Sequence, residues 1–158
     1  MRWILSIFTR GKISVVKRNK GCVRQKTSRN HKCISQGQHY DLKQIYQLLN
    51  AHYFEGKLDL KVTWFGNQNR SVTSKRLLGS YNSRQRLVKV HRLLDNPHFP
   101  DYFISYIVYH EMLHHLFPPI KTKGKRQIHH DLFKAGERKF QHYELAKNWQ
   151  KENKNKFF

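Results

Sequence analysis

The stretch VYHEMLHHLFPP, residues 108–119, places a glutamate between histidines inside one of the most apolar segments of the chain. A charged side chain is costly to bury unless it is paired, hydrogen-bonded or bound to a metal ion. From Asp101 to Phe117 apolar residues occupy most sides of a helical projection, which predicts a central and largely buried helix. Pro118 and Pro119 are expected to end this helix.

His110, Glu111 and His114 form the pattern HExxH within this helix. Residues four apart lie one above the other on a helix, so both imidazoles can reach a single metal ion. Zinc is the expected ion, because it takes nitrogen ligands and keeps one position open for water in catalytic sites. Glu111 then serves as general base towards the zinc-activated water. The structural alternative is two core histidines bonded to backbone groups, with Glu111 paired to a lysine.

A catalytic zinc ion requires a third protein ligand. The extended metzincin pattern needs Gly at position 117 and His at position 120, but Phe117 and Ile120 stand there and exclude that class. Downstream, His129, His130 and Glu137 all carry suitable donor atoms. The residues alone leave these three candidates open.

The flanking segments predict an α+β domain around the HExxH helix. Apolar residues recur at helical spacing after Asp41, which fits an N-cap, and Gly56 fits the end of that N-terminal helix. Strands are expected over residues 60–65, 77–82 and 86–91, where β-branched and aromatic residues gather. We expect these strands to form a small antiparallel three-stranded sheet.

The chain divides into three expected parts. Residues 1–37 contain ten Lys or Arg and no acidic residue, which predicts a flexible basic arm. Residues 38–149 hold the predicted strands and helices, the last helix running from about His130 to Trp149, and residues 150–158 form a polar, frayed tail. Cys22 and Cys33 both lie in the arm and form no CxxC pair, which excludes a zinc ribbon. A reduced pair is the default expectation, with one disulfide as the alternative.

The charge of the chain is strongly one-sided. Its 158 residues carry 31 Lys and Arg against 10 Asp and Glu, a formal net charge of +21. Such a surface attracts polyanions, so we expect nucleic acid as a partner. No apolar run approaches the roughly 18 residues that span a bilayer, so no transmembrane segment is predicted. We expect a cytoplasmic, nucleic-acid-associated protein, and organelle targeting by the basic N-terminus stays open.

The segment HEMLHH, a basic loop and then HHDLF resemble the SprT-like zinc metalloprotease family, which includes the Spartan-type proteases. In that family the third ligand stands four residues before a phenylalanine at the start of the next helix. Phe133 is that phenylalanine here, so the resemblance assigns the third ligand to His129. A small residue follows this ligand in the family, whereas His130 stands here, and His130 is kept as the reserve ligand. The resemblance covers about residues 41–145 and implies a SprT-like zincin core without the family's frequent C-terminal zinc ribbon.

The resemblance implies a zinc-dependent endopeptidase that acts on proteins bound or crosslinked to DNA. We expect the substrate backbone to lie extended along an edge strand within residues 77–91. Tyr81, Tyr109 and the basic loop 121–126 are candidates for stabilising the oxyanion, although each also fits a structural or solvated role. The protein substrate and the oligomeric state leave no signal in the sequence.

The loop KTKGKR falls between the second and third metal ligands, so its cations are expected near the mouth of the site. The nucleic-acid-binding candidates are Lys121, Lys123, Lys125 and Arg126. Trp3, Trp64 and Trp149 could stack unpaired bases, but core packing is the expectation for the last two.

Other functions are compatible with the same residues. The main alternative is a basic nucleic-acid-binding module with a structural or catalytically lapsed zinc site. Two further alternatives are a general metallopeptidase whose charge is incidental and a zinc hydrolase of a non-peptide bond. The intact Glu111 favours an enzyme, because a purely structural zinc site has no need of that carboxylate.

Overall fold

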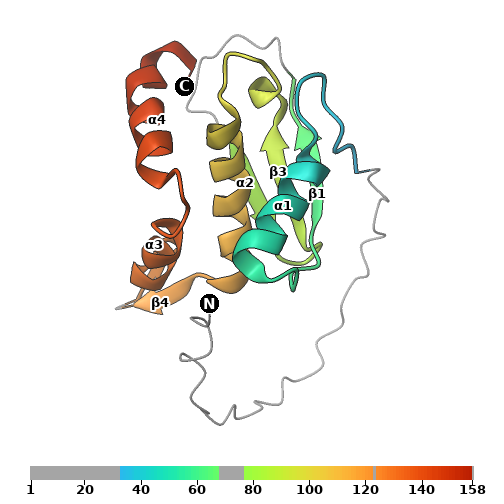
Figure 1. Ribbon diagram of the computed structural model, residues 1–158. Helices are drawn as coiled ribbons and strands as arrows, with labels where there is room; N and C mark the ends of the chain where they lie inside the picture. The colour runs from blue at the N-terminus through green and yellow to red at the C-terminus, as the bar shows by residue number, and fades with distance from the viewer. Residues whose placement is uncertain (1–32, 68–76, 123, 158) are drawn as a thin grey trace. The chain divides into compact units, whose positions relative to one another are not determined.

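In the computed structural model, residues 33–67, 77–122 and 124–157 are described (Figure 1). Most of the predicted basic arm lies outside the described residues, as do Trp3, Cys22 and Lys123. In chain order the elements are α1 (Leu42–Phe54), β1 (Lys61–Phe65), β2 (Gly79–Asn82), β3 (Leu87–His91), the short 3-10 helix η1 (Arg92–Leu94), α2 (Asp101–Leu116), β4 (Ile120–Thr122), β5 (Lys125–Gln127), α3 (Asp131–Glu137) and α4 (Tyr143–Phe157). The described residues form an α+β fold, as predicted.

Helix α1 begins and ends where the sequence predicts. The Asp41 carboxylate accepts the backbone N–H groups of Lys43 (2.8 Å) and Gln44 (3.4 Å), which have no partner within the helix. At the other end Glu55 and Gly56 both have positive φ angles, 55° and 70°, a left-handed conformation that stops a helix. The N-cap at Asp41 and the helix end at Gly56 are confirmed.

The three-stranded sheet has the order β1-β3-β2. Strand β2 runs antiparallel to β3, with Gly79 opposite Val90, but β1 runs parallel to β3, with Trp64 opposite Val90. All three strands are present, yet the prediction of an antiparallel sheet is wrong for β1. Alternation of apolar residues marks the faces of a strand and not its direction. Residues 66–86, which include β2, are long enough for the crossover that a parallel pair requires.

Helix α2 is the centre of the domain, as predicted from its apolar circumference. Nine of its 16 residues are buried, and it contacts α1, α3, α4, β2 and β3. Figure 1 shows α2 between the sheet and the two C-terminal helices. The helix ends at Leu116, directly before Phe117 and the two prolines. The site residues on α2 are therefore held by packing on nearly every side.

The segment after α2 differs from the prediction in two places. The expected basic loop is a two-stranded hairpin in which Lys121 of β4 lies opposite Arg126 of β5. The expected single helix over 130–149 is divided into α3 and α4, because the side chain of Phe140 turns into the core and is only 4% exposed. Helix α4 continues to Phe157 and so includes residues 150–157 of the predicted polar tail.

The chain that leads into α1 is held by the rest of the domain. Ile34 accepts the backbone N–H of Trp64 (2.8 Å), which adds an extended residue beside β1. Asp95 is 1% exposed, and its carboxylate accepts the backbone N–H groups of Gln38 (2.7 Å), His39 (2.9 Å) and Tyr40 (3.2 Å). Residues 33–37, assigned to the arm by composition, therefore include backbone that bonds to the domain.

Among the described residues, no helix combines the length and the apolar character needed to cross a bilayer.

Candidate metal centre

Three histidines from two parts of the chain converge at one point. His110 and His114 lie on successive turns of α2, and His129 lies just before α3. One ring nitrogen from each lies within 4.8 Å of the others, and the ring centroids are 5.0–5.1 Å apart. These are the three ligands that the sequence and the resemblance predict. His130 lies outside this group; it is 6% exposed and its ring faces Phe117.

The spacing of the His114 and His129 nitrogens fits a tetrahedral zinc ion. The Nε2 atoms of His114 and His129 are 3.3 Å apart. Two nitrogens about 2.05 Å from a tetrahedral zinc ion are separated by about 3.3 Å. A direct N–H···N hydrogen bond of that length would be a poor one, whereas a shared metal ion satisfies both lone pairs. The donor set of three imidazoles, with a fourth position open, is typical of a catalytic zinc site.

The Phe133 ring packs against all three histidine rings. Its centroid lies 5.0 Å from that of His110, 4.6 Å from His114 and 4.7 Å from His129. Phe133 is fully buried in the first turn of α3. The four-residue step from His129 to Phe133 thus places an apolar support beneath the ligands, which restricts their rotation and keeps water from that side.

Glu111 is buried beside the histidines without a counter-ion among the described residues. The residue is 6% exposed, and its carboxylate forms no hydrogen bond or ion pair with any described residue. Burial raises the pKa of its carboxyl from 4.5 to about 7, although the nearby His110 acts in the opposite direction. The lysine pair of the structural alternative is therefore absent from the described residues. A carboxyl group with a pKa near neutrality is suited to accepting and returning a proton.

Helix α2 packs against the edge strand β2 around Glu111. A Cβ atom built on Gly79 would lie 2.6 Å from Oε1 of Glu111, so only glycine leaves room for the carboxylate. One turn along α2, Nδ1 of His115 lies 2.7 Å from the Tyr81 hydroxyl. The Tyr81–His115 pair has no signal in the sequence.

Glu137, the remaining ligand candidate, lies behind the histidines instead of among them. Its Oε1 is 2.8 Å from Nδ1 of His110 and also accepts the Tyr106 hydroxyl. Burial by itself would raise the pKa of this carboxyl, but the hydrogen bonds from His110 and Tyr106 outweigh it and lower the pKa to about 2. Glu137 is therefore ionised and supports a ligand. The sequence analysis did not predict that Tyr106 bonds to Glu137. Its position four residues before His110, on the same face of the helix, is the signal that could have indicated a place near the metal centre.

Burial also keeps His114 and His129 in the form that binds metal. Desolvation lowers the pKa of His114 to about 4, and neighbouring His110 and His129 act in the same direction. Desolvation lowers the pKa of His129 as well, with His110 adding to the effect. A neutral imidazole offers a lone pair to a metal ion, and a protonated one does not. Around neutral pH the imidazoles of His114 and His129 are thus ready to bind a metal ion.

The other predicted residues divide into exposed and buried ones. Lys121, Lys125 and Arg126 are exposed on the β4–β5 hairpin, directly before His129. The Tyr109 hydroxyl donates to the carbonyl of Gly136, and its buried position excludes the oxyanion role proposed for it. Core packing is confirmed for Trp64 and Trp149: the first is 5% exposed, and the second contacts Phe99 and Phe103.

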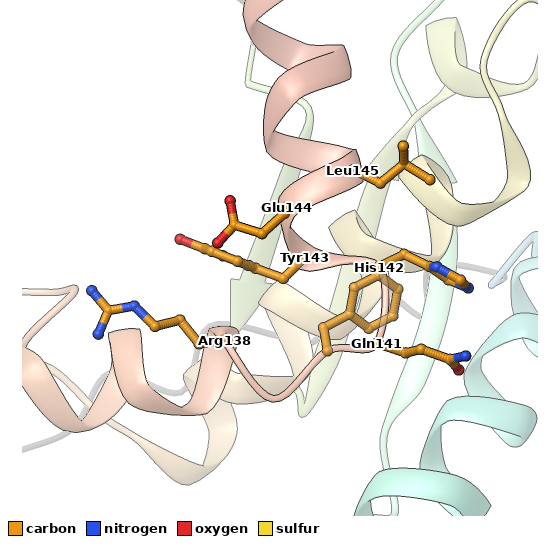
Figure 2. A pocket seen from close by; sticks show the side chains of 7 residues that line it. Arg138, Gln141, His142, Tyr143, Glu144 and Leu145 are labelled. Atoms are coloured by element: carbon orange, nitrogen blue, oxygen red, sulfur yellow. The ribbon is translucent and has the colours of Figure 1, made fainter.

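A separate hollow lies at the turn between α3 and α4 (Figure 2). Its lining includes Arg138, His142, Tyr143 and Glu144 but none of the clustered histidines. Figure 2 shows His142 pointing away from Glu144, so the polar groups do not converge. The metal centre is therefore the site in which chemistry-bearing side chains meet.

Comparison with protein family models, with curated proteins and with solved structures finds no match.

Proposed function

We propose that the protein is a zinc-dependent endopeptidase of the SprT-like type. The observation that carries this proposal is the placement of Glu111: a buried carboxylate with no ion pair among the described residues, next to three histidines whose ring nitrogens lie within 4.8 Å of one another. A structural zinc site would not require that carboxylate, and a folded core would not retain it without a partner. The α+β fold, the HExxH helix and the His129–Phe133 step support the family assignment.

Each residue of the centre has a chemical role in this proposal. A zinc ion held by His110, His114 and His129 would supply the Lewis acidity that polarises a peptide carbonyl and activates water. Glu111 accepts the proton of the attacking water and delivers it to the leaving amine, because its pKa of about 7 lets it do both near neutral pH. Phe133 supports the ligand rings from the protein side.

The edge strand β2 is suited to holding the substrate backbone. The backbone N–H of His91 bonds to the carbonyl of Leu78 (2.8 Å). Bonded pairs alternate along an antiparallel ladder, so the outward N–H and C=O groups of β2 belong to Gly79 and Tyr81. These are the two residues that face α2 at Glu111 and His115. A peptide added to β2 as an antiparallel or parallel strand would therefore run beside the general base.

The direct test is proteolysis by the full-length protein and by Glu111→Gln. We expect the zinc-loaded wild type to cleave an unfolded protein such as casein, with cleavage abolished by chelation and restored by zinc. Glu111→Gln should retain zinc and lose activity by a factor of at least about 10². A wild type that holds zinc and cleaves no peptide bond would refute the endopeptidase and favour the binding module.

We further propose that the protein works on nucleic acid, most directly through the β4–β5 hairpin. The support is the net charge of +21 and the placement of Lys121 opposite Arg126 on exposed strands. Like charges directly opposite on a ribbon repel each other, and a bound phosphate relieves that repulsion. The hairpin joins α2 to His129, so a nucleic acid bound there lies next to the metal centre.

The salt dependence of oligonucleotide binding tests the hairpin. The logarithmic slope against salt should fall by about 1.4 for single strands when Lys121→Ala and Arg126→Ala remove two phosphate contacts. Lys43→Ala with Lys61→Ala removes two exposed charges from α1 and β1 and serves as the matched control. Equal slopes for the hairpin variant and wild type would assign binding to another part of the chain.

A further inference from the structure

The hydrogen bonds behind the metal centre connect α3 to α2 through one carboxylate. Glu137 is the last residue of α3, and its side chain is 9% exposed. The same oxygen, Oε1, accepts the Tyr106 hydroxyl and lies 2.8 Å from Nδ1 of His110. Tyr106 and His110 stand four residues apart on α2, so both donors approach Glu137 from one face of that helix.

This bond determines which nitrogen of His110 is left for the metal ion. A neutral imidazole has one N–H and one lone pair. A carboxylate can only accept a hydrogen bond, so the proton lies on Nδ1, facing Glu137. The lone pair is then on Nε2, the ring nitrogen that does not face Glu137, and the His114 and His129 rings are 5.0 Å away. Without the carboxylate, both tautomers and a flipped ring become accessible.

We propose that Glu137 is the positioning residue of the metal centre, which holds His110 in the Nδ1–H tautomer and completes a carboxylate–histidine–metal arrangement. This inference rests on the proposed function, because it assumes that the three histidines bind zinc. Tyr106 lies on the same helix as His110, and its hydroxyl orients the Glu137 carboxylate by a hydrogen bond.

A second contact allows positioning to be separated from simple helix docking. The hydroxyl of Tyr109 donates to the carbonyl of Gly136 (2.9 Å), one residue before Glu137. This bond also ties α2 to α3, but it does not involve a metal ligand. Tyr109→Phe therefore removes a docking bond of the same two helices and leaves His110 untouched. Glu144→Gln, at an exposed position of α4, controls for the loss of one negative charge.

The experiment measures zinc affinity by competition with a chromophoric chelator on full-length variants that were first stripped of metal. We expect Glu137→Ala to weaken zinc binding by about 10- to 100-fold. Glu137→Gln keeps a neutral acceptor of the same shape and should fall between Glu137→Ala and wild type. Tyr109→Phe and Glu144→Gln should bind zinc as wild type does. Wild-type affinity in Glu137→Gln and Glu137→Ala, or an equal loss in Tyr109→Phe, would overturn the proposal.

A second readout does not depend on the folding of a variant. Long-range proton–nitrogen NMR spectra of the metal-free wild type report the tautomer of each histidine. We expect His110 to carry its proton on Nδ1, facing Glu137. An Nε2–H tautomer in the wild type would contradict the positioning role. Normal zinc affinities without proteolysis would refute only the peptidase, whereas a wild type that binds no zinc would refute both proposals.

Discussion

The Glu111 carboxylate occupies the space in which residue 79 would carry its side chain, and Gly79 leaves that space free. A Cβ atom at this position would lie 2.6 Å from Oε1 and 2.9 Å from Cγ of Glu111. The Glu111 side chain thus packs directly against the backbone of the edge strand at Gly79. This contact joins residues 32 positions apart in the sequence, and it brings the backbone that we propose binds substrate against the residue that we propose moves the proton.

We predict that Gly79→Ala displaces the Glu111 carboxylate. The added methyl group meets the carboxyl group inside a packed contact, so the free energy of unfolding should fall by about 1–3 kcal/mol. The proteolytic rate should fall more steeply than stability, because the base no longer points at its water. Thermal unfolding and cleavage are measured together, with Ser80→Ala on the same strand as the control. Undiminished cleavage by Gly79→Ala would show that the contact does not position the base.

We predict that Glu111→Gln changes the stability of the metal-free protein in a pH-dependent way. The pKa of Glu111 is raised from 4.5 to about 7 in the folded protein, so folding is penalised when the carboxylate ionises. The neutral Glu111 carboxyl makes its full contribution to the free energy of unfolding below pH 4.5, and this contribution is lost as pH rises through 7. Relative to wild type, Glu111→Gln should thus gain up to roughly 3 kcal/mol at pH 8 and little at pH 4.

Chemical denaturation of the chelated proteins at both pH values measures this difference. The gain must appear mainly between the two pKa values, because only there do the folded and unfolded states differ in protonation. A gain of equal size at pH 4 and pH 8 would mean that the change acts through packing and not through the charge of Glu111.

We predict that the two adjacent histidines before α3 respond differently to substitution. His129→Ala should lose the zinc ion, because its ring belongs to the metal-binding group. His130→Ala should keep near-stoichiometric zinc and lose about 2–4 kcal/mol of stability, because its buried ring fills space beside Phe117. Elemental mass spectrometry on desalted protein, together with thermal unfolding, separates the two effects. Zinc loss in His130→Ala alone would reverse the ligand assignment.

We predict that Asp95 holds the entrance to α1. Asp95→Ala leaves three backbone N–H groups without their acceptor, so the free energy of unfolding should fall by about 2–4 kcal/mol. The control is Asp59→Asn, whose side chain is 94% exposed and 3.6 Å from Arg86; it should change stability by less than about 0.5 kcal/mol. Equal urea midpoints for the two variants would contradict the anchoring role.

The sequence by itself was sufficient for the features that depend on neighbours along the chain. The buried helix with HExxH, the N-cap at Asp41 and the positions of the three strands follow from short-range spacing. A helix brings residues four apart together whatever surrounds it, so the pairing of His110 with His114 could be predicted before any tertiary contact was known.

Tertiary structure decided what depends on residues far apart in sequence. The parallel direction of β1, the break at Phe140 and the hairpin in place of a loop all arise from packing between elements. From the residues alone, His129, His130 and Glu137 were three equivalent donors. The fold brings His129 to the metal centre, buries His130 beside Phe117 and places Glu137 behind His110. Side-chain chemistry determines which groups can bind zinc, but only the docking of α3 on α2 determines which of them reach it.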